Sequence, residues 1–188
     1  MSSLASSYHE QEGKIIIFLD IDGVLRPFGH VDQDNRVFPP CTLAALAYVL
    51  TALPDAQLVL SSTWRVQKSF IDVITQDFCA FGGILAQRDF LDITDPDLHT
   101  ERQHEIYEWL SKHDTTVRAW VALDDEELIE GQANRQYRHL FAQHVVKTDS
   151  HAGMTMEDAH HAVTLLQNQL SKTKTRMRNN STENERVV

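Results

Sequence analysis

The chain has 188 residues, 42% of them hydrophobic and 23% charged, and 27 acidic against 17 basic side chains give a formal charge of −10. This length predicts a single domain that can bury a core without disulfides or structural metals. The composition excludes wholesale disorder and collagen-like repeats, and the acidity disfavours binding to nucleic acid or anionic membranes through bulk charge.

The two ends of the chain differ in composition from its middle. Residues 1–13 are polar and serine-rich, and residues 171–188 show no apolar periodicity, so we expect flexible ends around a folded body at 14–170. The N-terminus lacks the regions of a secretion signal, no stretch approaches the roughly 18 apolar residues of a membrane helix, and Cys41 and Cys79 lack paired spacing. These features predict a cytoplasmic protein with reduced thiols, no membrane partner and no evident obligate protein partner.

Within the body, apolar runs alternate with helix-like stretches. Continuous β-branched and apolar runs predict buried strands at 14–20, 57–62, 118–125 and 144–149. Helical periodicity predicts helices at 40–53, 66–78, 100–113 and 155–170. The alternation predicts an α/β fold with a doubly wound, Rossmann-like parallel sheet. The glycine-rich motifs of dinucleotide and P-loop sites are absent.

Polar side chains follow the predicted strands at their carboxyl ends, where ligands bind in such sheets. Asp20 and Asp22 follow the first strand, Ser61 and Ser62 end the second, and Asp124 and Asp125 end the third. If the first and third strands are neighbours, the four aspartates converge, and like charges so close together require a cation. A set of oxygen ligands suits a hard ion such as Mg²⁺.

The run IFLDIDGVL, which contains Asp20 and Asp22, resembles the first motif of the haloacid dehalogenase (HAD) phosphohydrolase superfamily. Ser61, Arg102 and the pair Asp124 and Asp125 resemble its second, third and fourth motifs and occur in the same order. The resemblance covers about residues 14–160 and implies a HAD-like catalytic domain. Arg102 departs from the lysine that is usual in the third motif, and its planar fork positions a phosphate differently from a point charge.

This resemblance implies a Mg²⁺-dependent phosphatase that forms an aspartyl-phosphate on Asp20. Asp22 would serve as general acid and then as general base, a role typical of phosphatases and phosphotransferases in the superfamily. The phosphoryl group would be bound by Arg102 and by Ser61, with Ser62 as the alternative to Ser61. The ion would be held by the Asp20 carboxylate, the Asp22 backbone carbonyl and either Asp124 or Asp125, of which we favour Asp125 as the direct ligand.

Several residues can also be interpreted without a catalytic role. Arg102 could be a solvated helix residue, in which case Lys112 is the substitute, and Asp124 with Asp125 could cap the following helix. Arg65 suits a substrate contact and a purely structural role equally well. The three tryptophans favour structural roles in the core or at its rim over base stacking.

Four segments together look like the small HAD domains associated with Swiss-army-knife RNA-repair proteins: LSSTWR, ERQHEIYEWL, WVALDDE and KTDSHAGMTMEDA. This likeness implies a phosphorylated substrate, with nucleic-acid ends and nucleotides as candidates. The gaps between the motifs are too short for a whole cap domain, so we expect an open site. Because the segment 171–188 carries +3 and the rest therefore carries −13, the basic tail could hold a polyanion near that site. The alternatives are a catalytically silent binding or regulatory module and a small-metabolite phosphatase.

Overall fold

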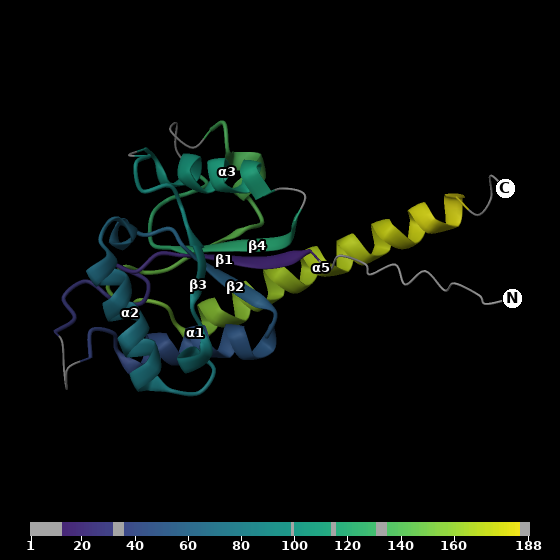
Figure 1. The fold of residues 1–188 in the computed structure, drawn as a ribbon. Helices are drawn as coiled ribbons and strands as arrows, with labels where there is room; N and C mark the ends of the chain where they lie inside the picture. The colour runs from purple at the N-terminus through teal and green to yellow at the C-terminus, as the bar shows by residue number, and fades with distance from the viewer. Residues whose placement is uncertain (1–12, 32–35, 99, 114–115, 131–134, 185–188) are drawn as a thin grey trace, which may run out of the picture.

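The computed structural model describes residues 13–31, 36–98, 100–113, 116–130 and 135–184. They form a five-stranded parallel sheet with helices on both faces (Figure 1). The sheet order is β3-β2-β1-β4-β5. The strands are β1 (Lys14–Leu19), β2 (Ala56–Leu60), β3 (Phe90–Ile93), β4 (Val117–Asp124) and β5 (Val145–Lys147). The predicted doubly wound α/β fold is confirmed. Strand β1 lies beside β4, which is the condition under which the sequence analysis expected the aspartates to converge.

Strand β3 was missed by the sequence analysis, which predicted four strands. It has four residues, lies at the edge of the sheet and pairs only with β2. Its Leu91 is 39% exposed, and its Asp92 accepts a hydrogen bond from the indole N–H of Trp109 at 2.7 Å. A short edge strand with an acidic residue inside it lacks the continuous apolar run that marks a buried strand.

Helices cover the sheet in two layers (Figure 1). On one face lie α1 (Pro40–Ala52), α2 (Lys68–Phe81) and α5 (Met156–Asn184), and on the other lie α3 (Arg102–His113) and the short α4 (Arg138–Phe141). Two 3-10 turns, η1 (Thr63–Val66) and η2 (Leu85–Gln87), link β2 to α2 and α2 to β3. Within the described residues no second domain covers the sheet.

The side chains of β1 divide between two buried cores, because successive residues of a strand point to opposite faces. Ile15, Ile17 and Leu19 pack in the core on the side of α1, α2 and α5. Ile16 and Phe18 pack on the side of α3 and α4, where the Phe18 ring meets two tryptophan rings edge to face. Burial on both faces explains why the run 14–20 contains no polar residue between Lys14 and Asp20.

A tight turn follows β1 and is held in place by hydrogen bonds from distant parts of the chain. The amides of Leu25 and Arg26 both donate to the carbonyl of Ile21. Thr148 Oγ1 donates to the carbonyl of Gly23 at 2.8 Å, and the Met154 amide donates to the carbonyl of Val24 at 2.7 Å. The chain segment that follows β5 therefore fixes the backbone immediately after the first aspartate motif.

Helix α5 is longer than the sequence analysis predicted. It continues past residue 170 to Asn184, because no glycine or proline follows Gly153 to stop it. The helix starts near the turn after β1 and passes the middle of β4, where the Gln169 side chain bonds to both the backbone N–H and the carbonyl of Trp120, each at 2.9 Å. It therefore runs from the carboxyl ends of the strands toward their amino ends, and its final turns project from the far end of the molecule (Figure 1).

This direction corrects the expectation that the basic tail lies near the open site, because the helix carries residues 171–184 away from the carboxyl edge of the sheet. Of the segment 1–13 only Gly13 lies within the described residues. No helix in the described ranges is long and apolar enough to span a bilayer.

Candidate functional site

Three carboxylates meet where β1 and β4 end. Asp20 comes directly after β1, Asp124 is the last residue of β4, and Asp125 follows it. Because β1 and β4 are parallel neighbours paired as far as Leu19 and Leu123, their next residues reach the same edge. One oxygen atom from each carboxylate lies within 4.8 Å of the other two. The convergence expected from the sequence is therefore present for these three residues.

Asp22 lies beside this cluster, but its carboxylate is held separately. One carboxylate oxygen accepts a hydrogen bond from the indole N–H of Trp64 at 2.8 Å, and the other lies 3.8 Å from a guanidinium nitrogen of Arg26. The next residue, Gly23, has φ +75°, and a Cβ there would overlap the Asp125 carboxylate. Glycine is needed at this position both for the backbone conformation and for the space that Asp125 occupies.

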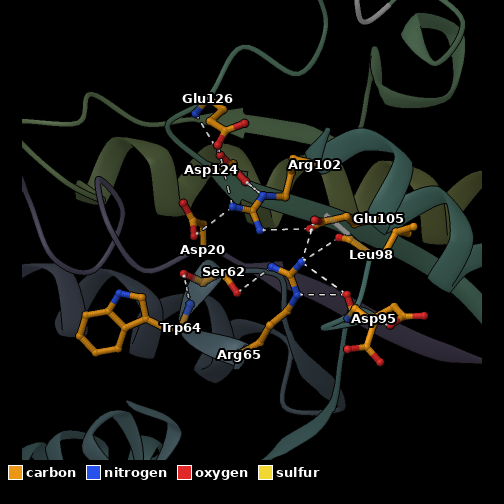
Figure 2. A network of polar contacts seen from close by, with 11 residues as sticks. Asp20, Ser62, Trp64, Arg65, Asp95, Leu98, Arg102, Glu105, Asp124 and Glu126 are labelled. Atoms are coloured by element: carbon orange, nitrogen blue, oxygen red, sulfur yellow. Dashed lines mark hydrogen bonds and ion pairs between the residues drawn. The ribbon is translucent and has the colours of Figure 1, made fainter. Parts of the chain in front are cut away.

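Arg102 is buried at the start of α3 and connects the acidic side chains (Figure 2). Its Nε lies 3.1 Å from Asp124 Oδ2, and its Nη2 lies 3.5 Å from Asp20 Oδ1. Glu105 and Glu126 lie at 3.7 and 3.9 Å from its terminal nitrogens. The alternative of a solvated helix residue does not hold for Arg102, and the substitute candidate Lys112 lies on the surface near Asp95.

A second buried arginine, Arg65 in η1, is linked to Arg102 through Glu105 (Figure 2). Its guanidinium donates to Glu105 Oε1 at 2.7 Å and to the backbone carbonyls of Ser62, Asp95 and Leu98. Glu105 therefore lies between two arginines. The structure resolves the reading of Arg65 that the sequence left even: its hydrogen bonds are structural and tie the loop after β2 to α3.

Glu105 was not singled out from the sequence, although it stands three residues after Arg102 on the same helix. That spacing places two residues on one helical face and was the available signal.

The two serines after β2 occupy different surroundings. Ser61 is 1% exposed, and its Oγ has no hydrogen-bond partner among the described residues. Ser62 is fully buried and caps η1, with its Oγ accepting from the Trp64 amide at 3.4 Å. Its side chain also lowers the pKa of the neighbouring Asp20 carboxyl group, against the raising effect of burial. A buried hydroxyl without a partner is costly unless a ligand satisfies it, which favours Ser61 as the hydroxyl left for a substrate.

The electrostatics of the cluster follow from its burial. Burial raises the pKa of Asp20, against the opposing charge of Arg102. Burial, and next the charge of Asp20, raise the pKa of Asp124 well above its usual value, and burial also raises the pKa of Asp125. Burial alone would lower the pKa of Arg102, but the neighbouring carboxylates outweigh it and raise this pKa. Extra positive charge would therefore stabilise the ionised carboxylates.

These residues fit a Mg²⁺ ion. Asp20, Asp124 and Asp125 offer oxygen atoms at mutual distances that one ion can bridge, and oxygen is the ligand atom that Mg²⁺ prefers. Asp124 Oδ2 is buried and accepts no hydrogen bond from the described residues, although it faces Arg102. The Asp22 carboxylate is not part of this group, so a metal role for Asp22 would rest on its backbone carbonyl, as the sequence analysis expected.

Open space adjoins two members of the site, Arg102 and Asp125. A hollow of about 470 Å³ is lined by residues of η1 and by Arg102, Glu105 and Glu126. Another, of about 530 Å³, is lined by Asp125 and by residues 147–151. The site is therefore reached from the surface at the carboxyl edge of the sheet.

Two comparisons with known proteins bear on this site. A search of curated proteins finds no significant match. Residues 16–159 match the family described as the HAD domain in Swiss Army Knife RNA repair proteins. The matched segment contains every strand of the sheet except the first two residues of β1, and it contains all the site residues described above. The chain therefore belongs to this family of HAD domains from Swiss Army Knife RNA repair proteins.

Proposed function

We propose that the protein is a Mg²⁺-dependent phosphatase that hydrolyses phosphate monoesters through an aspartyl-phosphate on Asp20. The observation that carries the proposal is the meeting of Asp20, Arg102 and Asp124 at one buried edge, with Asp22 beside them. A nucleophile, a proton donor and positive charge are the groups that phosphoryl transfer needs.

In the first step a carboxylate oxygen of Asp20 attacks the phosphorus atom. A bond forms between this oxygen and phosphorus while the bond from phosphorus to the leaving oxygen breaks, and Asp22 gives its proton to the leaving oxygen. Arg102, within 3.5 Å of Asp20, is placed to hold the phosphoryl group next to the nucleophile. The unpartnered hydroxyl of Ser61 is proposed to donate to a phosphoryl oxygen.

In the second step water hydrolyses the aspartyl-phosphate. The water oxygen bonds to phosphorus, one of the two water protons passes to the Asp22 carboxylate, and the bond between phosphorus and the Asp20 oxygen breaks to release inorganic phosphate. One water is consumed, and both carboxyl groups return to their starting states. A bound Mg²⁺ supplies positive charge that offsets the charge of the phosphoryl oxygens and of the surrounding carboxylates.

Asp20, Asp125 and the Asp22 carbonyl are the proposed direct ligands of the ion. Asp124 is proposed to act mainly on Arg102, which lies 3.1 Å from its carboxylate.

We further propose a phosphorylated nucleic-acid end as the substrate. The family's association with RNA repair supports this choice, and so does the absence of a covering domain over the carboxyl edge among the described residues, since a large substrate needs an open site. A net negative body does not oppose the docking of one end, because a bound ion would partly neutralise the carboxylates of the site.

Hydrolysis of an activated aryl phosphate tests the reaction. We expect turnover that needs Mg²⁺ and is lost in Asp20→Asn, because an amide cannot form the acyl-phosphate bond. Asp55→Asn is the matched control, since Asp55 is exposed at the opposite, amino end of β2. Equal turnover by Asp20→Asn and the wild type would rule out the mechanism.

A substrate panel tests the second part of the proposal. It compares oligonucleotides that carry a 3′- or 5′-phosphate with nucleotides, phosphopeptides and sugar phosphates. We expect the highest kcat/KM for an oligonucleotide end. Clear turnover of a sugar phosphate without turnover of any oligonucleotide would overturn the substrate assignment while leaving the phosphatase reaction in place.

A further inference from the structure

Among the residues that the structure describes, the donor of a close hydrogen bond to the Asp22 carboxylate is Trp64. Trp64 Nε1 lies 2.8 Å from Asp22 Oδ2, and these residues are 42 positions apart in the chain. The Asp22 side chain is 39% exposed, so solvent alone would leave its carboxylate free to rotate. The neighbouring Arg26 is also partly exposed and lies 3.8 Å from the other oxygen, a distance longer than a hydrogen bond.

Trp64 is itself held firmly in η1. Its backbone amide donates to Ser62 Oγ. Its ring packs between Phe38 and Phe70, with ring centroids 5.9 and 5.2 Å away, and Phe38 is fully buried. The indole N–H therefore cannot turn away from Asp22 unless this aromatic group repacks.

We propose that Trp64 is the positioning residue for Asp22, which it holds in one orientation with one carboxyl oxygen left for the leaving group. This inference rests on the proposed phosphatase function. The indole is suited to the task because its N–H only donates and carries no charge. It can bond to a carboxyl oxygen before and after Asp22 gives up its proton, so the same orientation serves both steps.

The proposed role of Trp64 allows the residues of the segment LSSTWR to be interpreted together. The Ser61 amide donates to the carbonyl of Leu19, the residue before the nucleophile, and Ser62 lies beside the nucleophile itself. Trp64 reaches the proton donor, and Arg65 reaches Arg102 through Glu105. The short turn after β2 thus contacts residues that act on both reacting oxygen atoms, namely the attacking oxygen of Asp20 and the leaving oxygen of the substrate.

The test is Trp64→Phe, which keeps an aromatic ring between Phe38 and Phe70 and removes the N–H. Trp109→Phe is a matched control, because Trp109 also donates its indole N–H to an aspartate, Asp92, away from the cluster. Each protein is assayed for kcat/KM on two phosphate monoesters, one with an acidic phenol and one with an alkyl alcohol as the leaving group. This ratio reports only the steps up to formation of the aspartyl-phosphate.

An alkoxide needs a proton in order to leave, whereas an acidic phenolate does not. General acid catalysis is worth about 10²–10⁴-fold, so we expect Trp64→Phe to lower kcat/KM for the alkyl ester by about 10-fold or more and for the aryl ester by less than about 3-fold. Trp109→Phe should change both values alike. In an Asp22→Asn background, Trp64→Phe should cause no further loss on the alkyl ester.

Equal losses of Trp64→Phe on the two esters, or no loss on either, would overturn the proposal. If Trp64→Phe fails to fold, Trp64→Leu gives the same comparison, since leucine is apolar and has no side-chain hydrogen-bond donor. These outcomes are distinct from failure of the proposed function, which would appear as wild-type turnover unaffected by Asp20→Asn.

Discussion

Replacing Glu105 by glutamine should destabilise the protein strongly. Both of its ion-pair partners, Arg65 at 2.7 Å and Arg102 at 3.7 Å, have side chains only 5% exposed, and the Glu105 side chain is 6% exposed. Glutamine has nearly the same shape, so the change removes charge without opening a cavity. Removing one partner of a buried ion pair costs about 3–5 kcal/mol, because the charge of Arg65 then stays buried with only backbone carbonyls as partners among the described residues.

Thermal unfolding measures this cost. The Tm of a chain of this size falls by roughly 2–4 °C for each kcal/mol lost from the free energy of unfolding. Glu105→Gln should therefore melt about 6–20 °C below the wild type. Glu101→Gln, at an exposed position just before α3, is the control and should shift Tm by less than about 2 °C. A double variant, Arg65→Gln with Glu105→Gln, should lose less than the two single losses combined. A Glu105→Gln protein that melts with the control would refute the idea that this carboxylate neutralises the two arginines.

Three other predictions concern the carboxyl edge. Arg102→Lys should lower kcat/KM on an aryl phosphate about 10-fold or more, since one ammonium cannot replace contacts from three guanidinium nitrogens, and unchanged kcat/KM would contradict this. Gly23→Ala should weaken Mg²⁺ binding measured by calorimetry, because its Cβ would displace the Asp125 carboxylate; equal affinity would argue against the proposed ligand. Burial raises the pKa of Asp20, Asp124 and Asp125. Without metal, the stability that these carboxyl groups contribute in their protonated form is lost as pH rises through the raised pKa values. The rise in Tm on adding MgCl₂ should therefore be larger at about pH 8 than at about pH 5.5, and equal rises would contradict a cation site at these carboxylates.

The parts of the fold with strong local signals were predictable from the sequence. β1 and β4 are buried on both faces, so their apolar runs are continuous and their ends are marked by acidic residues. The sequence predicted that Asp20 and Asp124 meet if these strands are neighbours, and the pairing of β1 with β4 supplies that condition. In contrast, β3 is held in the sheet by its pairing with Leu58, Val59 and Leu60 of β2. A strand propensity that depends on a neighbouring strand cannot be read from four residues.

The site was predictable as a set of residues, but the contacts between them were less so. The role of Arg102 was predictable from its position on the helix before the third predicted strand. The bond from Trp64 to Asp22 spans 42 positions and that from Arg65 to Glu105 spans 40, and no periodicity or motif connects residues so far apart. Trp64 was expected to be structural, and its ring does pack against Phe38 and Phe70. Its N–H, however, bonds to a residue of the proposed catalytic set, which the residue type alone does not indicate.

The Gln169 side chain completes a part of the sheet that no strand covers. β5 pairs with β4 only from Ala122 onward, so the backbone groups of Trp120 face outward from the sheet on that side. Exposed N–H and carbonyl groups on a strand edge invite pairing with another chain and aggregation. The amide of Gln169 occupies both groups of Trp120, as a neighbouring strand would. An incoming strand would first have to displace α5, so the helix protects this edge against intermolecular sheet growth.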